Sequence, residues 1–426
     1  MGRVSLYFLL LMKALDMKPY NRIAELKRIA YAGCLGVIGI ISTEFGIIGV
    51  LPQVASHYHI AIEQAGLLLS AFALTIFLLG PFVVLFTSGI NKKKMMMVAI
   101  SLFLVSNIVS AFGPPFWLLL VFRVLPAILQ PVFFSAAMGA VISQSTKAEQ
   151  HKLMGIVIGG IAIAQVTIIP LTTYMSSLYG WQTSFMVQGL ISLIAVAGIM
   201  AFIPDMPVTE TPTYGSQLSI LKKPRFIISV AMNVFLISAW FSSYSYFADY
   251  LGKAKMMTGE QISYMLFLFG IAGLFANWLA GRLLSKNIPL TTAFFLLGTM
   301  VLPIILQFSG DNFLIQILVI AFWGIMYGPA FLTAISYMID AAPEAPEFAN
   351  SLQSSFGNLG VSIGTAVGGW FIANRGINDL PWLGAVFGVL ALLMIFFRVV
   401  LDKRLAKENH QNSIENANMS SYANAQ

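Results

Sequence analysis

Long apolar stretches, separated by short polar segments, fill most of this chain. Twelve of them are long enough to cross the hydrocarbon core of a bilayer as helices, at a rise of about 1.5 Å per residue. They lie at residues 29–52, 65–90, 95–112, 116–142, 153–178, 183–204, 226–248, 261–284, 289–308, 313–339, 348–373 and 380–400. This pattern predicts an all-α membrane protein with twelve transmembrane helices.

A polar, proline-containing segment at residues 205–225 divides these stretches into two sets of six. We therefore expect two six-helix bundles, at residues 29–204 and 226–401, joined by this linker. Residues 1–28 form an N-terminal segment. Residues 402–426 form a polar tail without apolar periodicity, which we expect to be disordered. Two such bundles predict a substrate site at the interface of the halves.

The N-terminal segment has two interpretations. Arg3 and the apolar run at residues 4–12 imitate a signal peptide, but Lys13 and Asp16 follow where a small-residue cleavage site would stand. The segment is either an interfacial element or the product of an upstream start codon, with initiation at Met17.

The composition excludes a soluble globular protein. Of 426 residues, 58% are hydrophobic and 10% are charged, whereas soluble domains contain about 25% charged residues. Cys34 is the only cysteine, so neither a disulfide framework nor a cysteine-based metal site can form, and we expect no cofactor. No histidine lies within a span and no phosphate-binding Gly-x-x-x-x-Gly-Lys-Ser/Thr run occurs. These absences argue against a membrane-embedded enzyme and against ATP hydrolysis by this chain.

Charge placement predicts the orientation. Nineteen of the 24 Lys and Arg residues fall in segments on the N-terminal side of the membrane, three fall in loops on the other side, and Arg123 and Arg398 lie within spans. The positive-inside rule then places both termini in the cytoplasm. The net charge of +7 follows from these short loops, so we expect no nucleic-acid partner.

Glu44 is the one ionisable acid or base in the otherwise apolar first span. A charged side chain at the centre of a transmembrane helix costs roughly 2.5–3.5 kcal/mol on insertion scales, so such residues usually have a function. Two interpretations remain. Glu44 is either a proton-binding or substrate-facing carboxylate, or a neutral acid hydrogen-bonded to a neighbouring helix.

Short motifs in a fixed order resemble one family. They are Thr43-Glu44-Phe45 and Gly49-Val50-Leu51-Pro52 in the first span, Glu63-Gln64-Ala65-Gly66 and Gly80-Pro81 in the second, Arg123-Val124-Leu125-Pro126-Ala127 in the fourth, and Gly180-Trp181-Gln182-Thr183-Ser184-Phe185 after the fifth. With these motifs, nearly the whole chain, residues 29–401, resembles a twelve-span major facilitator superfamily transporter. The branch is that of the drug:proton antiporters, which includes bacterial sugar (arabinose-type) efflux permeases.

The resemblance implies the major facilitator fold in a bacterial inner membrane, and export of a solute against protons. Two positions depart from the family pattern. Ser88 stands where the loop after the second span usually carries an Asp, although the basic run that follows is retained. Ile169 precedes Pro170, where the antiporter motif of the fifth span has Gly before Pro.

Glu44 and Arg123 are candidates for proton coupling. Each lies about seven residues from the outer end of its span, which places both about 10 Å below the outer boundary of the membrane. In the family that the chain resembles, the first and fourth spans line the central cavity, so we expect the two side chains to face each other. Burial favours the neutral carboxyl and a nearby guanidinium favours the charged one, so protonation would respond to wetting of the cavity. The alternative is a static ion pair.

Further candidates come from polar and aromatic residues. Those expected to line a substrate cavity are Gln130, Gln165, Trp240, Tyr244, Trp323, Tyr327 and Asn358, although such residues also join helices. Those expected to act in gating are Asp340, Lys92, Lys93 and Lys94, with a solvated helix cap as the alternative for Asp340.

The sequence thus predicts a secondary active transporter, proton-coupled and exporting a small sugar or drug-like solute by alternating access. Export of nucleosides or amino acids and inward symport remain alternatives. The expected partners are the solute, protons and the lipid bilayer, and we expect a monomer.

Overall fold

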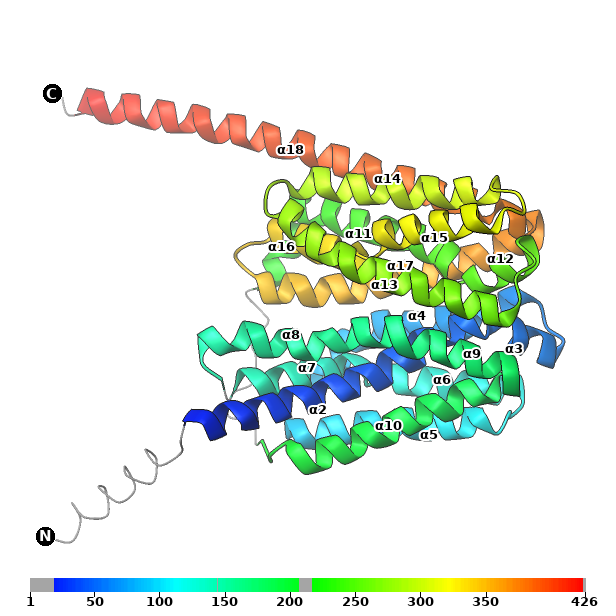
Figure 1. The fold of residues 1–426 in the computed structure, drawn as a ribbon. Helices are drawn as coiled ribbons and strands as arrows, with labels where there is room; N and C mark the ends of the chain where they lie inside the picture. Colours follow the sequence, from blue (N-terminus) through cyan, green and yellow to red (C-terminus); the bar gives the residue numbers. More distant parts are fainter. Residues whose placement is uncertain (1–18, 144, 207–216, 424–426) are drawn as a thin grey trace, which may run out of the picture. The chain divides into compact units, whose positions relative to one another are not determined.

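The computed structural model describes residues 19–143, 145–206 and 217–423. Within these residues the structure is helical, and twelve helical segments are long and apolar enough to cross a membrane (Figure 1). The prediction of an all-α, twelve-span membrane protein is confirmed. The two interpretations of the first 18 residues concern a segment that lies outside the described residues.

The predicted spans match the observed helices to within a few residues at most ends. The first half consists of α2 (Pro19–Gly46) with η1 (Ile47–Gly49), α3 (Leu51–Tyr58), α4 (Ile62–Thr87), α5 (Lys92–Ala111), α6 (Phe116–Ala127), α7 (Gln130–Ile142), α8 (Lys147–Ile163), η2 (Ala164–Ile168), α9 (Ile169–Tyr179) and α10 (Gln182–Phe202). The second half consists of η3 (Gln217–Lys222), α11 (Pro224–Tyr244), α12 (Phe247–Ala254), α13 (Gly259–Leu284), α14 (Ile288–Gln307), α15 (Phe313–Tyr327), α16 (Ala330–Ala341), α17 (Pro346–Arg375), η4 (Ile377–Asp379) and α18 (Leu380–Ala423).

Proline accounts for several interruptions within spans. α6 ends just after Pro126 and α7 begins just before Pro131, so the fourth span is broken between them. In the fifth span the π-helical turn η2 precedes Pro170, and in the tenth α15 and α16 meet at Pro329. Proline lacks the backbone N–H that would bond to the preceding turn, and its ring crowds that turn, which favours such breaks.

The expected disorder of residues 402–426 is wrong for the part that the structure describes. α18 continues without a break to Ala423. The residues from Asp402 to Ala423 include neither glycine nor proline, and Lys, Arg, Glu, Gln and Ala are good helix formers. Arg404 also pairs with Glu408 one turn later, at 2.9 Å, as expected of i,i+4 pairs on a helix.

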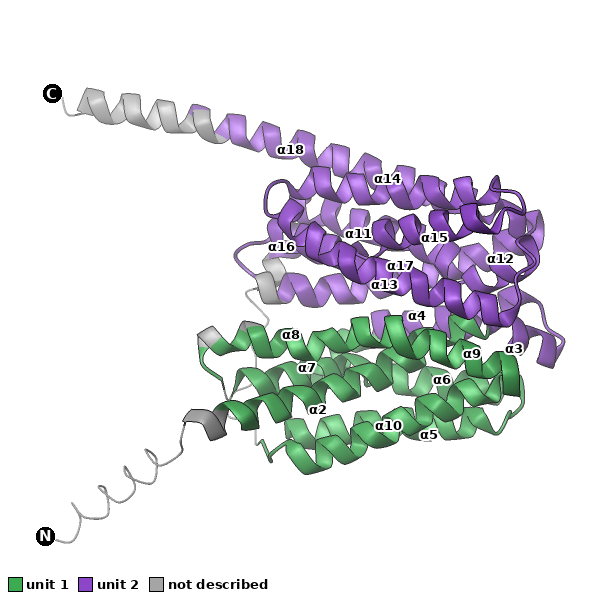
Figure 2. Ribbon diagram, viewed as in Figure 1, with its two compact units in different colours: residues 1–50, 79–212 green, residues 51–78, 213–426 purple. Residues whose placement is uncertain are grey.

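The chain forms two compact units, residues 1–50 with 79–212 and residues 51–78 with 213–426 (Figure 2). In each, one span is more buried than the rest. The most apolar window of the span Ile23–Gly49 is 89% buried, and that of Pro224–Ala254 is 67% buried, against at most 50% for the other ten. The side chains that the other spans expose are largely apolar, as lipid contact requires.

Small residues let the central span of each unit approach its neighbours. In the first unit, a Cβ atom at Gly160 of α8 would lie 2.7 Å from the Cys34 carbonyl of α2. In the second, Gly360, Gly364 and Gly368 of α17 all lie against the backbone of α11. This glycine row, spaced by four residues, is therefore a helix-packing surface.

We expect Gly364→Ala to destabilise the protein. The added Cβ would lie 2.7 Å from the Ser238 carbonyl oxygen and 3.0 Å from its Cα, and a helix backbone does not yield easily. The predicted loss is about 1–3 kcal/mol of unfolding free energy, measured by thermal unfolding of the purified protein in detergent. Gly159→Ala is the matched control, because no atom lies within 4 Å of its Cβ position. Equal melting temperatures for both variants would contradict this packing.

Candidate functional site

Glu44 lies in the last turn of α2, with 3% of its surface exposed. Its carboxylate oxygen Oε2 accepts a hydrogen bond from Nε2 of Gln130, the first residue of α7, at 2.7 Å. Gln130 is itself 6% exposed. The structure thus joins a proton-coupling candidate directly to a residue that the sequence assigned to the substrate cavity.

Arg123 lies beside Glu44 but binds its backbone. Its Nη2 donates to the Thr43 carbonyl at 2.8 Å and to the Glu44 carbonyl at 3.3 Å, and its guanidinium lies 5.8 Å from the centre of the Phe185 ring. The last carbonyls of a helix begin to lose their helical partners, and a positive charge is favourable there. Arg123 therefore caps α2 in the first unit, with its side chain fully buried.

The spacing of Arg123 and Gln130 in the sequence is consistent with their both contacting the end of α2. Gln130 follows Arg123 by seven residues, which is two helical turns, so an unbroken helix would present both on one face. The span is in fact divided after Ala127, yet both side chains still reach the last turn of α2. The sequence analysis assigned Gln130 to the substrate cavity and did not consider its seven-residue spacing from Arg123.

A second polar group, which the sequence analysis missed, holds α2 against two other helices. Asn107 of α5 donates through Nδ2 to the Thr43 hydroxyl at 2.8 Å and to the Ser192 hydroxyl of α10 at 3.3 Å. All three residues are buried. Asn107 could have been identified from the sequence, because it is an amide side chain within the predicted third span. The contacts fix the end of α2 next to Glu44.

This arrangement suits a carboxyl group that changes its protonation state. Burial favours the neutral acid, while the Gln130 amide and the Arg123 charge favour the carboxylate. Gln130 Oε1 is buried and has no hydrogen-bond partner among the described residues. The same amide side chain can therefore donate to an ionised Glu44 or accept from a protonated one.

In the second unit, the four aromatic cavity candidates form one cluster. Tyr327 lies 4.8 Å from Tyr244 and 5.9 Å from Trp240, measured between ring centres. Phe269 links Tyr327 to Trp323, at 5.0 and 5.2 Å. The hydroxyl of Tyr327 is buried and has no hydrogen-bond partner among the described residues. The four predicted aromatic residues thus belong to one buried cluster, in which the Trp240 indole N–H donates to the Thr299 hydroxyl at 3.1 Å.

The two remaining cavity candidates are only partly buried. Gln165 lies in the π-helical turn η2, a feature often found at functional sites. Asn358 of α17 donates to the Ser354 carbonyl of its own helix at 3.0 Å. Its Oδ1 is buried without a partner among the described residues.

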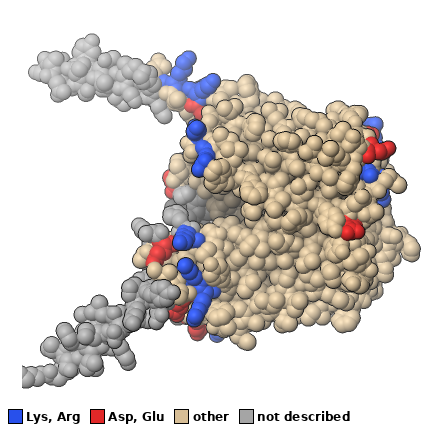
Figure 3. All heavy atoms as spheres, viewed as in Figure 1, with Lys and Arg blue, Asp and Glu red and all other residues tan. Residues whose placement is uncertain are grey.

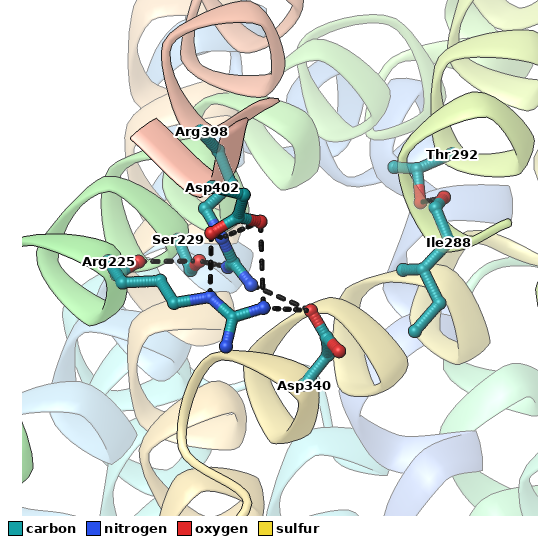
Figure 4. Close-up of polar contacts among 7 residues, drawn as sticks. All are labelled: Arg225, Ser229, Ile288, Thr292, Asp340, Arg398 and Asp402. Atoms are coloured by element: carbon teal, nitrogen blue, oxygen red, sulfur yellow. Dashed lines mark hydrogen bonds and ion pairs between the residues drawn. The ribbon is translucent and has the colours of Figure 1, made fainter. Parts of the chain in front are cut away.

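Asp340 belongs to a cluster of four charged residues near the start of α11 (Figure 4). Its Oδ2 is 3.1 Å from Arg225 of α11 and 2.6 Å from Arg398 of α18. Asp402 pairs with the same two arginines, at 2.8 and 3.0 Å. Arg398, 1% exposed, also donates to the Ser229 hydroxyl. The alternating charges tie the start of α11 and the end of α16 to the middle of α18.

The basic run after α4 binds helix ends in the first unit. Lys92 Nζ donates to the Gly139 carbonyl of α7 at 3.3 Å, and Lys93 Nζ to the Met200 carbonyl of α10 at 3.1 Å. The backbone N–H of Lys94 donates to the Asn91 side chain, which in turn donates to Asp205 at 2.5 Å. Ser88 stands where the family pattern has an Asp. Its hydroxyl donates to the carbonyl of Leu85, three residues earlier in the chain.

Comparisons with known proteins agree with this architecture. A sequence profile of the Major Facilitator Superfamily matches residues 33–347. The "Inner membrane transport protein YdhP" of Escherichia coli strain K12 is 27% identical over 365 residues, which cover 85% of this chain and 93% of that protein. A "Probable sugar efflux transporter" of Helicobacter pylori strain P12 is 25% identical over 364 residues, with coverage of 85% and 93%.

A solved structure shows the same fold. It is a bacterial homologue of the human lysosomal transporter Spinster, in an inward-facing and occupied conformation. It matches with a TM-score of 0.73 and 15% identity, covering 90% of this chain and 98% of that one.

We expect Asp340→Asn to destabilise the protein by about 1–3 kcal/mol, because two arginines would then share the Asp402 carboxylate. The double variant with Arg225→Gln should lose less than the sum of the single losses, as a double-mutant cycle would show. If the losses of unfolding free energy in the two single variants simply add up in the double variant, Asp340 and Arg225 do not interact as the structure indicates.

The exposed Lys223–Glu344 pair, at 2.7 Å, is the control for the Asp340 cycle. Glu344→Gln should cost at most about 1 kcal/mol. The hydrogen bond from Lys223 lowers the pKa of the Glu344 carboxyl. The small stabilisation from this pair is therefore present at neutral pH and is lost as the pH falls through that lowered pKa. The difference in unfolding free energy between the wild type and Glu344→Gln should therefore shrink as the pH falls from neutral to acidic, which unfolding of both proteins at a series of pH values would measure.

Proposed function

The chain belongs to the major facilitator superfamily, and from that premise we propose that it exports a small organic solute in exchange for protons by alternating access. The observation that carries this proposal is Glu44, a buried carboxyl group in the most buried span, held by Gln130. We infer from the distribution of Lys and Arg that both termini lie in the cytoplasm. In the proposed exchange, protons move inward while the solute moves outward.

Glu44 has the properties of an exchangeable proton carrier. A carboxylate at this depth is unfavourable unless its surroundings compensate, and functional acids are the usual exception. Its side-chain partner is an amide, which is compatible with both protonation states. Because Arg123 also contacts the Glu44 backbone, movement of the end of α2 would alter both the charge near Glu44 and the access of water to it.

The aromatic cluster of the second unit supports a substrate with a ring. Binding sites for small molecules are lined mainly by apolar and aromatic side chains with a few polar groups that orient the ligand. Trp240, Tyr244, Trp323 and Tyr327 are aromatic side chains of this kind, and the buried Tyr327 hydroxyl has no hydrogen-bond partner among the described residues. Gln165 and Asn358 are further candidates for polar contacts.

The relatives support export of a sugar or drug-like molecule. One of them is named as a probable sugar efflux transporter, with 93% of its length matched. Nucleosides or amino acids as exported solutes, and inward symport, are the alternatives. Asp340 and Lys92–Lys94 are proposed to act in gating, because both groups bind helix ends that must shift when access alternates.

The proposal predicts that Glu44→Gln abolishes coupled transport. Inside-out vesicles with an acid interior would be exposed to sugars, nucleosides, amino acids and cationic drugs while the internal pH is followed. A transported solute should release protons from wild-type vesicles, and Glu44→Gln vesicles should match vesicles without the protein. Solute exchange without a proton gradient should persist in the variant, because the amide resembles a permanently neutral acid.

Glu25→Gln is the matched control, since Glu25 lies on the same helix α2 but is exposed. It should couple as the wild type does. Undiminished proton release by Glu44→Gln would refute the role of Glu44. In vesicles of the opposite, right-side-out orientation, proton entry together with the added solute would instead establish inward symport.

A further inference from the structure

Two bases lie close together at the end of α13. Elsewhere in the second unit, several basic side chains are paired with acids, as in Lys223–Glu344, Arg225–Asp340, Arg398–Asp402 and Arg404–Glu408. Arg282, in the last turn of α13, and Lys286, just after it, are exposed and have no acidic partner among the described residues. Residues 261–310 include no Asp or Glu, so this part of the chain supplies no counter-charge.

Arg282 is held in a defined position. Its guanidinium carbon lies 3.7 Å from the centre of the Trp278 ring, one helical turn earlier. A guanidinium stacked on an aromatic face keeps its in-plane N–H groups available, and these match the oxygens of a phosphate. Trp278 is 64% exposed, so the stacked pair forms a surface feature.

An apolar strip continues from this pair toward the middle of α13. Phe275 is 72% exposed and Leu279 is 43% exposed. They precede Arg282 by seven and three residues, which places all three on one side of the helix. In a transmembrane helix such a strip contacts acyl chains, and tryptophan is enriched at the level of the lipid headgroups.

We propose that Trp278, Arg282 and Lys286 form a binding site for the headgroup of an anionic phospholipid, with an acyl chain along Phe275 and Leu279. The phosphate would accept hydrogen bonds from Arg282 and contact Lys286. Two positive charges without a protein counter-charge favour a headgroup with net negative charge over a zwitterionic one. A soluble anion would make no use of the adjoining apolar strip. On the face drawn in Figure 3, the blue Lys and Arg side chains lie near the edges. The proposed site is distinguished by its combination of a stacked guanidinium, a lack of nearby acids and an apolar strip.

The test measures lipid binding by the full-length protein in a neutral detergent. Phosphatidylglycerol and phosphatidylcholine would be titrated separately, and bound lipid counted by native mass spectrometry. We expect the wild type to prefer phosphatidylglycerol. The double variant Arg282→Gln with Lys286→Gln should bind it about 10-fold to 30-fold more weakly, at roughly 1 kcal/mol for each base.

The matched control is Lys223→Gln with Arg404→Gln, which removes two charges that already have acidic partners. It should retain wild-type affinity. Trp278→Leu, which keeps both charges, should weaken binding because Arg282 loses its platform. Excess inorganic phosphate should leave the lipid bound. Equal loss in the control, no preference for phosphatidylglycerol, or displacement by inorganic phosphate would each overturn the proposal, whatever the protein transports.

Discussion

A polar group within a bilayer has to find its hydrogen-bond partners inside the protein, because the hydrocarbon core offers none. The described spans are helical for that reason, and the same constraint shapes the surroundings of Glu44. The carboxyl group is bonded by an amide, the last carbonyls of α2 by Arg123, and the Thr43 hydroxyl by Asn107. Three helices of the first unit, α5, α6 and α7, thus contact the end of α2.

The second unit meets the constraint differently. Arg398 is almost fully buried, and its charge is balanced by Asp340 and Asp402 in a cluster shared with Arg225. There the charges neutralise one another and join the start of α11, the end of α16 and the middle of α18. In the first unit the acid has an amide partner that can serve either protonation state. This difference separates a charge cluster that joins helices, for which we propose a role in gating, from the proton-carrying role proposed for Glu44.

Much of the fold could be predicted from the sequence, because span length and hydropathy are direct consequences of bilayer thickness. Glu44 was identifiable for the same reason, as an acid in an apolar span. Its partners were less predictable. Contact between Glu44 and Gln130 depends on the rotation of each helix about its axis and on the break after Ala127, and neither is encoded in hydropathy. The helix beyond Asp402 was missed because absent apolar periodicity was equated with disorder, although helix propensity and the Arg404–Glu408 pair support it. The aromatic cluster was anticipated residue by residue, but not that its rings contact one another.

The most direct test of the central claim is to observe the Glu44 proton itself. Infrared difference spectroscopy of the purified protein in lipid would compare spectra before and after addition of a transported solute. If Glu44 carries the proton, the wild type should show a change in a protonated carboxylic acid band. That change should be absent from Glu44→Gln and retained in Glu25→Gln. The same band change in Glu44→Gln would show that another group takes up and releases the proton, and would contradict the account.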